Sequence, residues 1–409
     1  MSSKNIALAV ITKYLDSISP YKDFIENAYN HNIKIKVLII VYSHGIEDNT
    51  YIKLKNILNE FNTKLKIVKA NNDPPLQEKL KKLGISSKNI KNLTSSPFFA
   101  KYKLLPYGQY RNIALLTALT YSSPIDYLFF IDTDVYPYLL KKNSYHTYFE
   151  KIDFFQEHLK YLKLPKTIIT SSDYSGYYIL PPLKLNFLKK FLIGLEKENC
   201  YNFLKNSIHG LKYASHKRKI KNTNKILGGN LAINLKYFNI LPPFYSTTYI
   251  FKNKLFLGRG EDTLFTKTIN KSRFRIIDID LKIFHNTYEN FPKKPSLDDK
   301  NVKDRIYYAS TGWLGRNHFL NWLYTKTGQQ TQKEWNKKLK REYKNLLIGS
   351  RELAFHLNEK RFLDLGDIFL SSYNQLDTMI EEYYKTIAAW NEVKRKLKKE
   401  CALNETTFN

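Results

Sequence analysis

The chain of 409 residues is longer than most single domains, so a main domain with an appended segment is the first expectation. Its hydrophobic content of 43% and aromatic content of 15% exclude a disordered chain. The formal net charge of +29 is carried mostly by lysine. Asparagine, isoleucine and tyrosine are also abundant, so the charge can reflect an AT-rich genome as easily as a polyanionic partner. It is compatible with anionic small ligands or membrane headgroups.

The two cysteines, Cys200 and Cys401, are too few for a disulfide framework or a cysteine-based zinc site, which fits a reducing compartment. The apolar run near the N-terminus lacks a small-residue cleavage pattern, so we interpret it as a first strand and not as a signal peptide. No run of roughly 18 apolar residues occurs, so no membrane span is expected. These features predict a cytoplasmic location.

Four apolar runs rich in β-branched residues lie in the first third of the chain, at residues 6–11, 36–42, 65–68 and 127–131. Helix-like segments separate them. Continuous apolar strands spaced in this way are typical of a parallel sheet that helices cover on both faces. The predicted fold class is therefore α/β, with a doubly wound, mostly parallel, Rossmann-like sheet.

The long connection between the third and fourth runs, residues 71–106, predicts a loop with one short helix at about residues 76–83. Long loops in compact domains are often functional, so this segment is a candidate cover for a ligand. The next segment, residues 108–123, predicts a helix with Leu115, Ala118 and Leu119 on one face.

The pattern changes near residue 300 to long helical stretches rich in lysine, glutamate, leucine and tyrosine. The polar, proline-punctuated segment 292–300 predicts a boundary between a main domain, residues 1–295, and a helical extension, residues 296–409. In the extension, Tyr383, Ile387, Trp390 and Val393 follow helical spacing, which indicates packing against the main domain or a partner. A second hypothesis is peripheral contact with the inner face of a membrane through the lysine-rich end.

The sequence Asp-Thr-Asp directly follows the fourth apolar run, so Asp132 and Asp134 lie at the carboxyl end of a buried strand. Ligands bind at this edge of a doubly wound sheet. Both side chains can face the same side, where they repel each other unless a cation lies between them. Mg²⁺ or Mn²⁺ together with a diphosphate would meet that need. The alternative is that the two acids cap the following turn.

Three later motifs supply residues of matching chemistry. The motif LGGNLAIN contributes Gly228 and Gly229, whose missing side chains allow a backbone to approach a sugar or nucleotide closely. The motif GRGEDTLF contributes Glu261 and Asp262 near the start of a helix-like segment. The motif IFHNTY contributes His285, which can add an imidazole nitrogen to a metal site. Each motif also has an alternative interpretation when taken alone. The two glycines are typical of an ordinary turn, Glu261 and Asp262 of acids in the first turn of a helix, and His285 of a structural histidine.

The order of these motifs (DTD, GGN, GED, IFHN) resembles the pattern of GT-A fold glycosyltransferases, and the helix GQYRNIAL resembles the matching helix of family-two enzymes. The likeness spans about residues 6–288. It implies a metal-dependent transfer of a sugar from a nucleotide diphosphate sugar to a hydroxyl of a glycan or glycoconjugate, with UDP-linked donors expected before GDP-linked ones. A role in cell-surface polysaccharide synthesis is also implied.

The resemblance implies a role for each metal-site residue. Asp134 would be the direct ligand of Mn²⁺ or Mg²⁺. Asp132 would contact the ribose or the metal through water, and His285 would complete the metal shell.

It also implies roles for residues around the metal. Asp262 would be the catalytic base of an inverting reaction, and Glu261 would hold the acceptor beside it. Arg111 would lie near the diphosphate or hold Asp132, and Asp73 would lie in the region that reads the nucleobase.

Several alternatives remain open at this stage. Retaining GT-A enzymes also carry Asp-x-Asp and a histidine, so the stereochemical course is not decided. A sugar nucleotidyltransferase would need a glycine-rich phosphate loop after the first strand, where this chain has ITKYLDSISP without glycine. A nucleic-acid-binding protein is suggested by the charge, but no zinc-finger, helix-turn-helix or aromatic RNA-binding motif supports it, so no nucleic-acid partner is expected. The donor sugar, the acceptor and the oligomeric state are also undecided.

Overall fold

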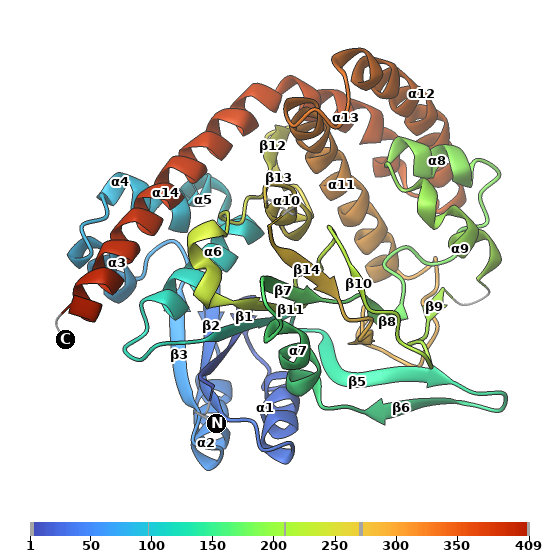
Figure 1. Ribbon diagram of the computed structural model, residues 1–409. Coiled ribbons are helices and arrows are strands. Elements are labelled where there is room, and N and C mark those ends of the chain that lie inside the picture. Colours follow the sequence, from blue (N-terminus) through green and yellow to red (C-terminus); the bar gives the residue numbers. More distant parts are fainter. Residues whose placement is uncertain (1–3, 97, 208–209, 270–272, 407–409) are drawn as a thin grey trace.

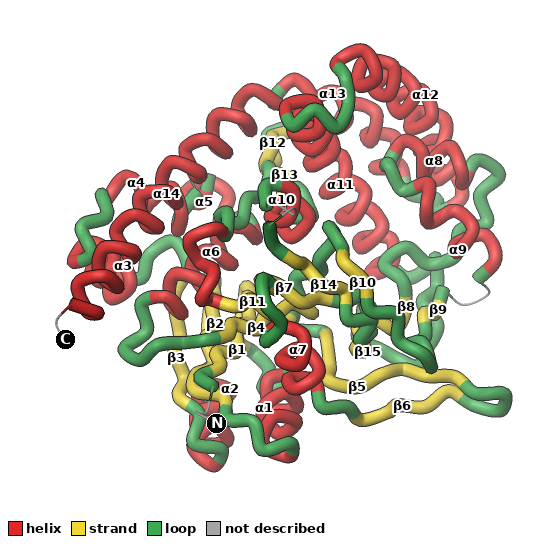
Figure 2. The backbone as a smooth tube through the Cα atoms, in the orientation of Figure 1, coloured by secondary structure: helices red, strands yellow, loops and turns green. Residues whose placement is uncertain are grey.

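The computed structural model describes residues 4–96, 98–207, 210–269 and 273–406, with backbone alone for residues 399–406. An eight-stranded sheet lies at the centre, and helices cover it on both sides (Figure 1). The arrangement of strands and helices is easiest to follow in Figure 2, where the sheet lies beneath an arch of C-terminal helices.

The central sheet has the strand order β10-β14-β7-β11-β4-β1-β2-β3. Its strands are β1 (Ile6–Leu15), β2 (Ile35–Ile46), β3 (Lys64–Lys69), β4 (Tyr127–Ile131), β7 (Thr167–Ser171), β10 (Lys221–Asn222), β11 (Asn230–Asn234) and β14 (Arg275–Asp278). Strands β1 to β4 are mutually parallel, whereas β11 runs antiparallel to both β4 and β7. Four of the seven pairings are parallel, which confirms the predicted α/β class and the four predicted strands.

Alternate residues of β1 divide the sheet core into two layers. Ile6 and Leu8 belong to a cluster with the helices α1 (Tyr21–Asn30), α2 (Asp48–Glu60) and α7 (Phe154–Leu162). Ala7 and Ala9 belong to a second cluster on the other face, with helix α6 (Tyr107–Leu119). Nearly all of α6 is buried, not only the face that the sequence indicated, because α4 (Ser87–Thr94), α10 (Glu261–Lys267) and the backbone at Phe244 also contact it.

The long connection before α6 is more helical than the sequence predicted. It contains α3 (Pro74–Lys82), α4 (Ser87–Thr94) and α5 (Phe99–Tyr102), so the prediction of a loop with one short helix is wrong for its second half. The side chain of Ser86 caps α4 by accepting from the backbone of Asn89, at 3.4 Å. Buried Ile90 and Leu93 then pack this helix onto the core. Its stability therefore comes largely from tertiary contacts.

A second sheet of five strands continues from the end of β4, in the order β6-β5-β15-β8-β9. Its strands are β5 (Val135–Lys142), β6 (Thr147–Lys151), β8 (Tyr174–Tyr177), β9 (Leu211–Lys212) and β15 (Ile283–His285). Smaller elements complete the main domain: the helices α8 (Leu188–Gly194), α9 (Tyr201–Asn206) and α10 (Glu261–Lys267), the 3-10 turns η1 (Glu198–Cys200) and η2 (Leu235–Ile240), and the hairpin β12 (Thr248–Phe251) and β13 (Lys254–Leu257).

The predicted helical extension is present as α11 (Lys300–Lys326), α12 (Gln332–His356), η3 (Lys360–Asp364), α13 (Leu365–Asn374) and α14 (Leu376–Thr406). It is packed into the main domain at both ends. Trp390 and Val393 of α14 belong to the same core cluster as α6, and Trp390 Nε1 donates to the backbone oxygen of Leu241. Helix α11 shares its own cluster with Tyr245 and Tyr249. Figure 1 shows α14 running from the α13 side of the molecule to α3 and α4. The boundary near residue 295 stays a prediction.

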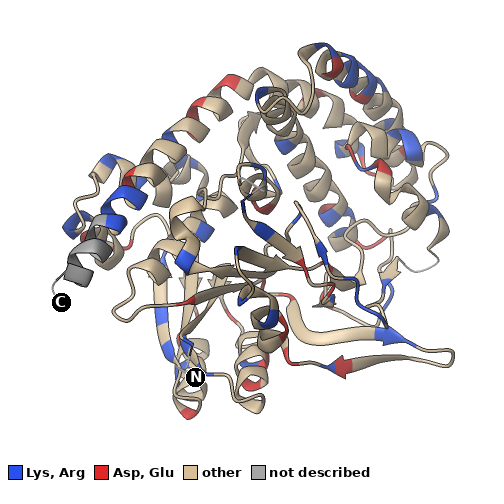
Figure 3. Cartoon of the chain, viewed as in Figure 1, with Lys and Arg blue, Asp and Glu red and all other residues tan. Residues whose placement is uncertain are grey.

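None of the helices in the described part of the chain is long and apolar enough to cross a membrane. Lysine and arginine are spread over α12, α14 and the edges of both sheets in the view of Figure 3, so the net charge does not by itself mark a binding face. Cys200 is a buried free thiol, and the side chain of Cys401 lies outside the described residues.

Candidate functional site

The register of the second sheet brings His285 to Asp134, although 151 residues separate them in sequence. Strand β5 begins at Val135, directly after the Asp-Thr-Asp turn, and β15 pairs with it so that His285 lies opposite Val135. The backbone nitrogen of Asn286 donates to the backbone oxygen of Asp134 at 2.8 Å. The sheet thus holds the imidazole at the carboxyl end of β4, as the sequence predicted.

The geometry around His285 fixes which ring nitrogen faces Asp134. The Thr287 hydroxyl donates to the backbone oxygen of Tyr177 at 2.8 Å, so the hydroxyl oxygen of Thr287 accepts from Nδ1 of His285, at 3.2 Å. In the neutral ring, Nε2 therefore carries a lone pair. That lone pair points at Oδ2 of Asp134 from 2.9 Å. Two lone pairs at this distance repel each other unless a proton or a metal ion lies between them.

The charges around Asp134 favour its ionised form. Burial raises the pKa of this carboxyl, but the charge and hydrogen bond that His285 supplies when a proton lies between the two groups, together with the charge of Arg305, lower it overall. Arg305 comes from α11 and lies 4.0 Å from Oδ2 of Asp134, and it also pairs with Glu289. The helical extension therefore supplies a cation to the edge of the site, which no sequence pattern indicated.

The residues present fit a divalent cation that is shared with a ligand. Asp134 and His285 offer one oxygen and one nitrogen at 2.9 Å, about the spacing of neighbouring ligands on an octahedral ion with bonds of about 2.1 Å. Within the described residues, no group of three or more His, Cys, Asp and Glu side chains is arranged to hold a metal. An ion of this kind commonly takes one or two protein ligands and completes its shell with water and phosphate oxygens.

Asp132, the third predicted ligand, has other partners. Its Oδ1 accepts from Nη2 of Arg111 and its Oδ2 accepts from the hydroxyl of Tyr174, both at 3.4 Å. Burial raises the pKa of this carboxyl, and Arg111 opposes that effect. The side chain remains 35% exposed, so it can still reach a ligand. A direct contact between Asp132 and a metal stays a prediction.

Arg111 joins three of the predicted motifs. Its guanidinium is buried on α6, and it donates from Nε to Oε1 of Glu261 at 2.9 Å and from Nη1 to the backbone oxygen of Gly228 at 3.0 Å. With Asp132 on Nη2, each nitrogen of the planar group donates. The arginine therefore fixes the GED and GGN segments relative to the end of β4. Of the two expected roles for Arg111, holding Asp132 is the one that the geometry favours.

The two glycines of the GGN motif make room for these side chains. A Cβ on Gly228 would overlap the guanidinium of Arg111, and a Cβ on Gly229 would overlap the carboxylate of Asp132. The sequence predicted that both glycines allow close approach to a sugar or nucleotide. The contacts show a further role, since their small size lets the acid and the arginine pack against the backbone, and the approach of a ligand stays a prediction.

Asp262 contacts the same glycine loop. Its Oδ2 accepts from the backbone nitrogen of Gly228 at 3.0 Å, and its Oδ1 accepts from the backbone nitrogen of Thr263 at 2.6 Å. Burial, followed by the charge of Glu261, raises the pKa of Asp262 to about 6. A carboxylate with a pKa near the working pH is suited to accept a proton during a reaction. Glu261 instead is committed to Arg111.

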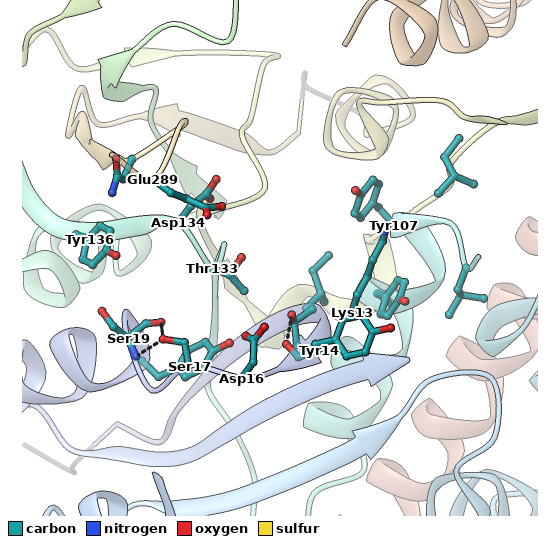
Figure 4. Close-up of a pocket in the computed structure, with 17 residues that line it drawn as sticks. Lys13, Tyr14, Asp16, Ser17, Ser19, Tyr107, Thr133, Asp134, Tyr136 and Glu289 are labelled. Carbon is teal, nitrogen blue, oxygen red and sulfur yellow. Dashed lines mark hydrogen bonds between the residues drawn. The ribbon is translucent and has the colours of Figure 1, made fainter. Parts of the chain in front are cut away.

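A cavity of about 530 Å³ opens beside Asp134. Its wall consists of the ends of β1 and β4, the start of α6 and the loop after β15, with Thr12, Lys13, Asp16, Ser17, Tyr107, Thr133, Asp134, Asn286 and Glu289 among the lining residues. Asp134 and Glu289 lie on one side of it, and Asp16, Ser17 and Ser19 on another (Figure 4). The volume falls in the range of small-molecule and cofactor sites, roughly 300–1,000 Å³.

Asp73 lies farther along the same edge of the sheet, at the start of α3 after β3. Its Oδ2 is buried and has no hydrogen-bond partner in the described part of the chain, and burial raises its pKa. A second cavity of about 520 Å³ follows the ends of β2 and β3, and it shares Tyr14 with the first one. Asp73 itself is not among the residues that line either cavity, so its predicted role in base recognition stays a prediction.

The structure thus brings together all the predicted site residues except Asp73. The residues that sequence reasoning missed are Tyr174, which contacts Asp132 and packs its ring 4.9 Å from that of His285, together with Thr287 and Arg305. Thr287 could have been found, because a hydroxyl two residues after a candidate metal histidine is well placed to orient it. No sequence signal marks Tyr174 or Arg305, since both reach the site through long-range packing.

No family model matches this chain, and no curated protein matches it by sequence. Several solved structures resemble it weakly. One is glucosyl-3-phosphoglycerate synthase from Mycobacterium tuberculosis, in complex with Mn²⁺, UDP and phosphoglyceric acid, at 13% identity and a TM-score of 0.38, covering 76% of each chain. Another is the mannosyltransferase PcManGT from Pyrobaculum calidifontis, in complex with GDP-Man and Mn²⁺, at 13% identity and a TM-score of 0.38, covering 98% of this chain and 86% of that one.

A third is S. aureus TarS, residues 1–349, at 11% identity and a TM-score of 0.33, covering 92% of this chain and 91% of that one. At these TM-scores and identities neither the fold nor the activity is inferred from the likeness. The α/β fold is established by the strand order and pairing of the chain itself.

Proposed function

We propose that this protein is a metal-dependent glycosyltransferase, which moves a sugar from a nucleotide diphosphate sugar to a hydroxyl of a glycan or glycoconjugate. The observation that carries the proposal is the pair formed by Oδ2 of Asp134 and Nε2 of His285, 2.9 Å apart, with Asp134 on the wall of a cavity at the carboxyl end of the sheet. Asp134 and His285 would hold the ion. When bound, Mn²⁺ or Mg²⁺ offsets the negative charge that develops on a departing diphosphate.

The chain supplies further groups suited to such a donor. Lys13, Thr12 and Ser17 line the cavity with a cation and two hydroxyls, and Arg305 lies at its edge beside Asp134. These groups can bind phosphate oxygens. The cavity is large enough for a nucleotide or a sugar diphosphate, and UDP-linked donors are our first expectation, before GDP-linked ones.

Asp262 is proposed to accept the proton of the acceptor hydroxyl. As the hydroxyl oxygen bonds to the anomeric carbon, its proton passes to the carboxylate, and the bond from that carbon to the diphosphate breaks with its electron pair on the leaving oxygen. A pKa of about 6 leaves Asp262 ionised at neutral pH while keeping it basic enough to take the proton. This course inverts the anomeric centre. Proton NMR of the first-formed product tests it, since retention of the donor configuration excludes a single displacement.

A panel of UDP- and GDP-sugars with Mn²⁺ tests the activity. Binding at 100 times Kd stabilises the folded state by about 2.7 kcal/mol, so the true donor raises the melting temperature, and released nucleotide is then measured with and without EDTA. We expect turnover with metal, loss in EDTA, recovery on adding Mn²⁺, and loss in Asp134→Asn. The exposed Asp298→Asn is the matched control. Full turnover in EDTA, or no response to any donor, contradicts the proposal.

A further inference from the structure

Arg316 of α11 is a buried cation that forms no ion pair with an acid in the described part of the chain. The residue is only 7% exposed, and its Nη2 donates to Oδ1 of Asn317 at 2.8 Å. Among the described residues, its Nε has no hydrogen-bond partner, and no acid forms an ion pair with the guanidinium. Burying a charge without a partner is costly. Burial accordingly lowers the pKa of Arg316.

This guanidinium lies directly against the segment that carries Asp262. A Cβ on Gly260 would come within 2.8 Å of Nη1 and 3.0 Å of Cδ of Arg316, so a larger residue there would require the arginine to shift. Gly260 also has a φ of 99°, which disfavours other residues. It precedes Glu261 and Asp262 in the chain, so Arg316 lies beside the proposed base.

Lys197 and Lys225 supply two further positive charges, and the charges of Arg316 and Lys225 both act on Lys197. Lys197 follows α8, and its amine lies over the ring of Trp313, 4.6 Å from the ring centroid. Trp313 lies on α11, one turn before Arg316. Burial, and then the charges of Arg316 and Lys225, lower the pKa of Lys197 to about 7. Lys225 lies in the loop that leads to Gly228. The three cations come from separate elements, and the side chain of Lys225 is exposed.

The nearby acids do not neutralise this cluster. Glu196 is paired with Lys338 at 3.1 Å and also accepts from Asn321. Asp262 accepts from two backbone nitrogens. Both charges reach Arg316, but neither acid forms an ion pair with it. The cluster of Arg316, Lys197 and Lys225 thus has the composition of an anion-binding site, with a guanidinium whose planar array of donors matches an oxyanion.

We propose that the acceptor of this enzyme carries an oxyanion, a phosphate or a carboxylate, next to the hydroxyl that receives the sugar, and that Arg316 binds it with Lys197 and Lys225. This inference rests on the proposed function, because it places the oxyanion beside the base Asp262. Binding of the anion would pair the buried guanidinium and orient the acceptor hydroxyl toward the carboxylate. Neutral acceptors would leave the arginine unpaired and would be used poorly.

Calorimetric titration of the full-length protein with inorganic phosphate, and separately with acetate, tests the anion site. We expect at least one anion to bind, with an affinity at least ten-fold lower in Arg316→Gln. The tighter probe identifies the group that the acceptor carries. Arg341→Gln, which removes an exposed guanidinium on α12, is the matched control and keeps the affinity of the unchanged protein. Absence of binding by both anions, or equal binding in Arg316→Gln, overturns the inference.

Two further measurements distinguish an acceptor site from a structural arginine and from a donor contact. Since Arg316 is unpaired without ligand, Arg316→Gln should melt at the same or a higher temperature, whereas a purely structural arginine would lower it. Arg316→Gln should also bind UDP with Mn²⁺ as the unchanged protein does. An equal loss of UDP and anion affinity would assign Arg316 to the donor and overturn the inference.

Lys197→Met covers the case in which Arg316→Gln does not fold, and it is expected to weaken anion binding at least three-fold. Unchanged anion affinity in this variant then overturns the inference. Failure of the proposed function is seen separately, as absence of nucleotide release from any nucleotide sugar by the unchanged protein.

Discussion

Replacing Thr287 tests how the metal-binding nitrogen of His285 is prepared. Thr287 is 1% exposed, and its hydroxyl accepts from Nδ1 of His285 while donating to the backbone oxygen of Tyr177. In Thr287→Val the side chain keeps its shape but loses the hydroxyl. The imidazole can then carry its proton on Nε2, where Oδ2 of Asp134 accepts it at 2.9 Å. A metal ion must displace that proton before it can bind.

The expected loss of metal affinity follows from the way in which a hydrogen-bond partner orients a metal-binding histidine. Removing the partner that orients a metal-binding histidine typically weakens metal affinity by about 10- to 100-fold, or about 1.4–2.7 kcal/mol. The carbonyl of Tyr177 also loses its donor, which lowers the free energy of unfolding by about 1–3 kcal/mol. The two effects are separable because the first is measured as a Kd for Mn²⁺ in the folded protein.

The assay is titration with Mn²⁺, followed by the electron paramagnetic resonance signal of the free ion, at a temperature well below the melting transition of each variant. Thr287→Ser keeps the hydroxyl and serves as the control, with a Kd within a few-fold of the unchanged protein. If Thr287→Val binds Mn²⁺ as tightly as Thr287→Ser, the hydroxyl does not select the tautomer and the reasoning fails.

Three further changes test other parts of the site and the fold. Asp262→Asn should lower kcat by about 10²- to 10⁴-fold with donor affinity unchanged. Burial raises the pKa of Asp262 to about 6, and only its ionised carboxylate accepts a proton. In the unchanged enzyme, kcat/KM should therefore rise about ten-fold per pH unit up to about pH 6 and then level off. A flat profile below pH 6 contradicts the role of Asp262. Gly229→Ala places a Cβ on the carboxylate of Asp132 and should weaken donor binding at least ten-fold in calorimetry; unchanged binding would argue against Asp132 as a donor contact. Trp390→Ala should lower the free energy of unfolding in urea by about 3–5 kcal/mol, because α14 is part of the main core. Phe355→Ala, at an 88% exposed position, should change it little. Equal effects of the two substitutions would contradict the packing of α14 into the core.

The sequence predicted the sheet well, and it predicted that the motifs meet at one end of it, because both follow from local patterns. Continuous β-branched runs have few stable outcomes other than buried strands, and a pair of acids at the end of such a run must meet solvent, a cation or a cap. The Asp-Thr-Asp turn, the glycine loop and the GED segment lie where the motif order predicts. His285 reaches Asp134 because β15 pairs with the strand that starts at Val135.

The rest could not be predicted, because it depends on contacts between distant segments. The helices in residues 74–102 are short and polar on one side, and α14 stabilises α4 from more than 290 residues away, as the bonds from Ser86 and Asn89 to Glu392 show. Arg305 and Arg316 are ordinary helix residues in the sequence. Only the packing of α11 over the site brings one to Asp134 and the other to Gly260.

Anomalous diffraction from crystals grown with Mn²⁺ and UDP tests the proposed metal site most directly. We expect a manganese peak between Oδ2 of Asp134 and Nε2 of His285, bridging to the diphosphate in the adjoining cavity. A fully occupied peak elsewhere, with Asp134 and His285 still in direct contact, would contradict the proposed site.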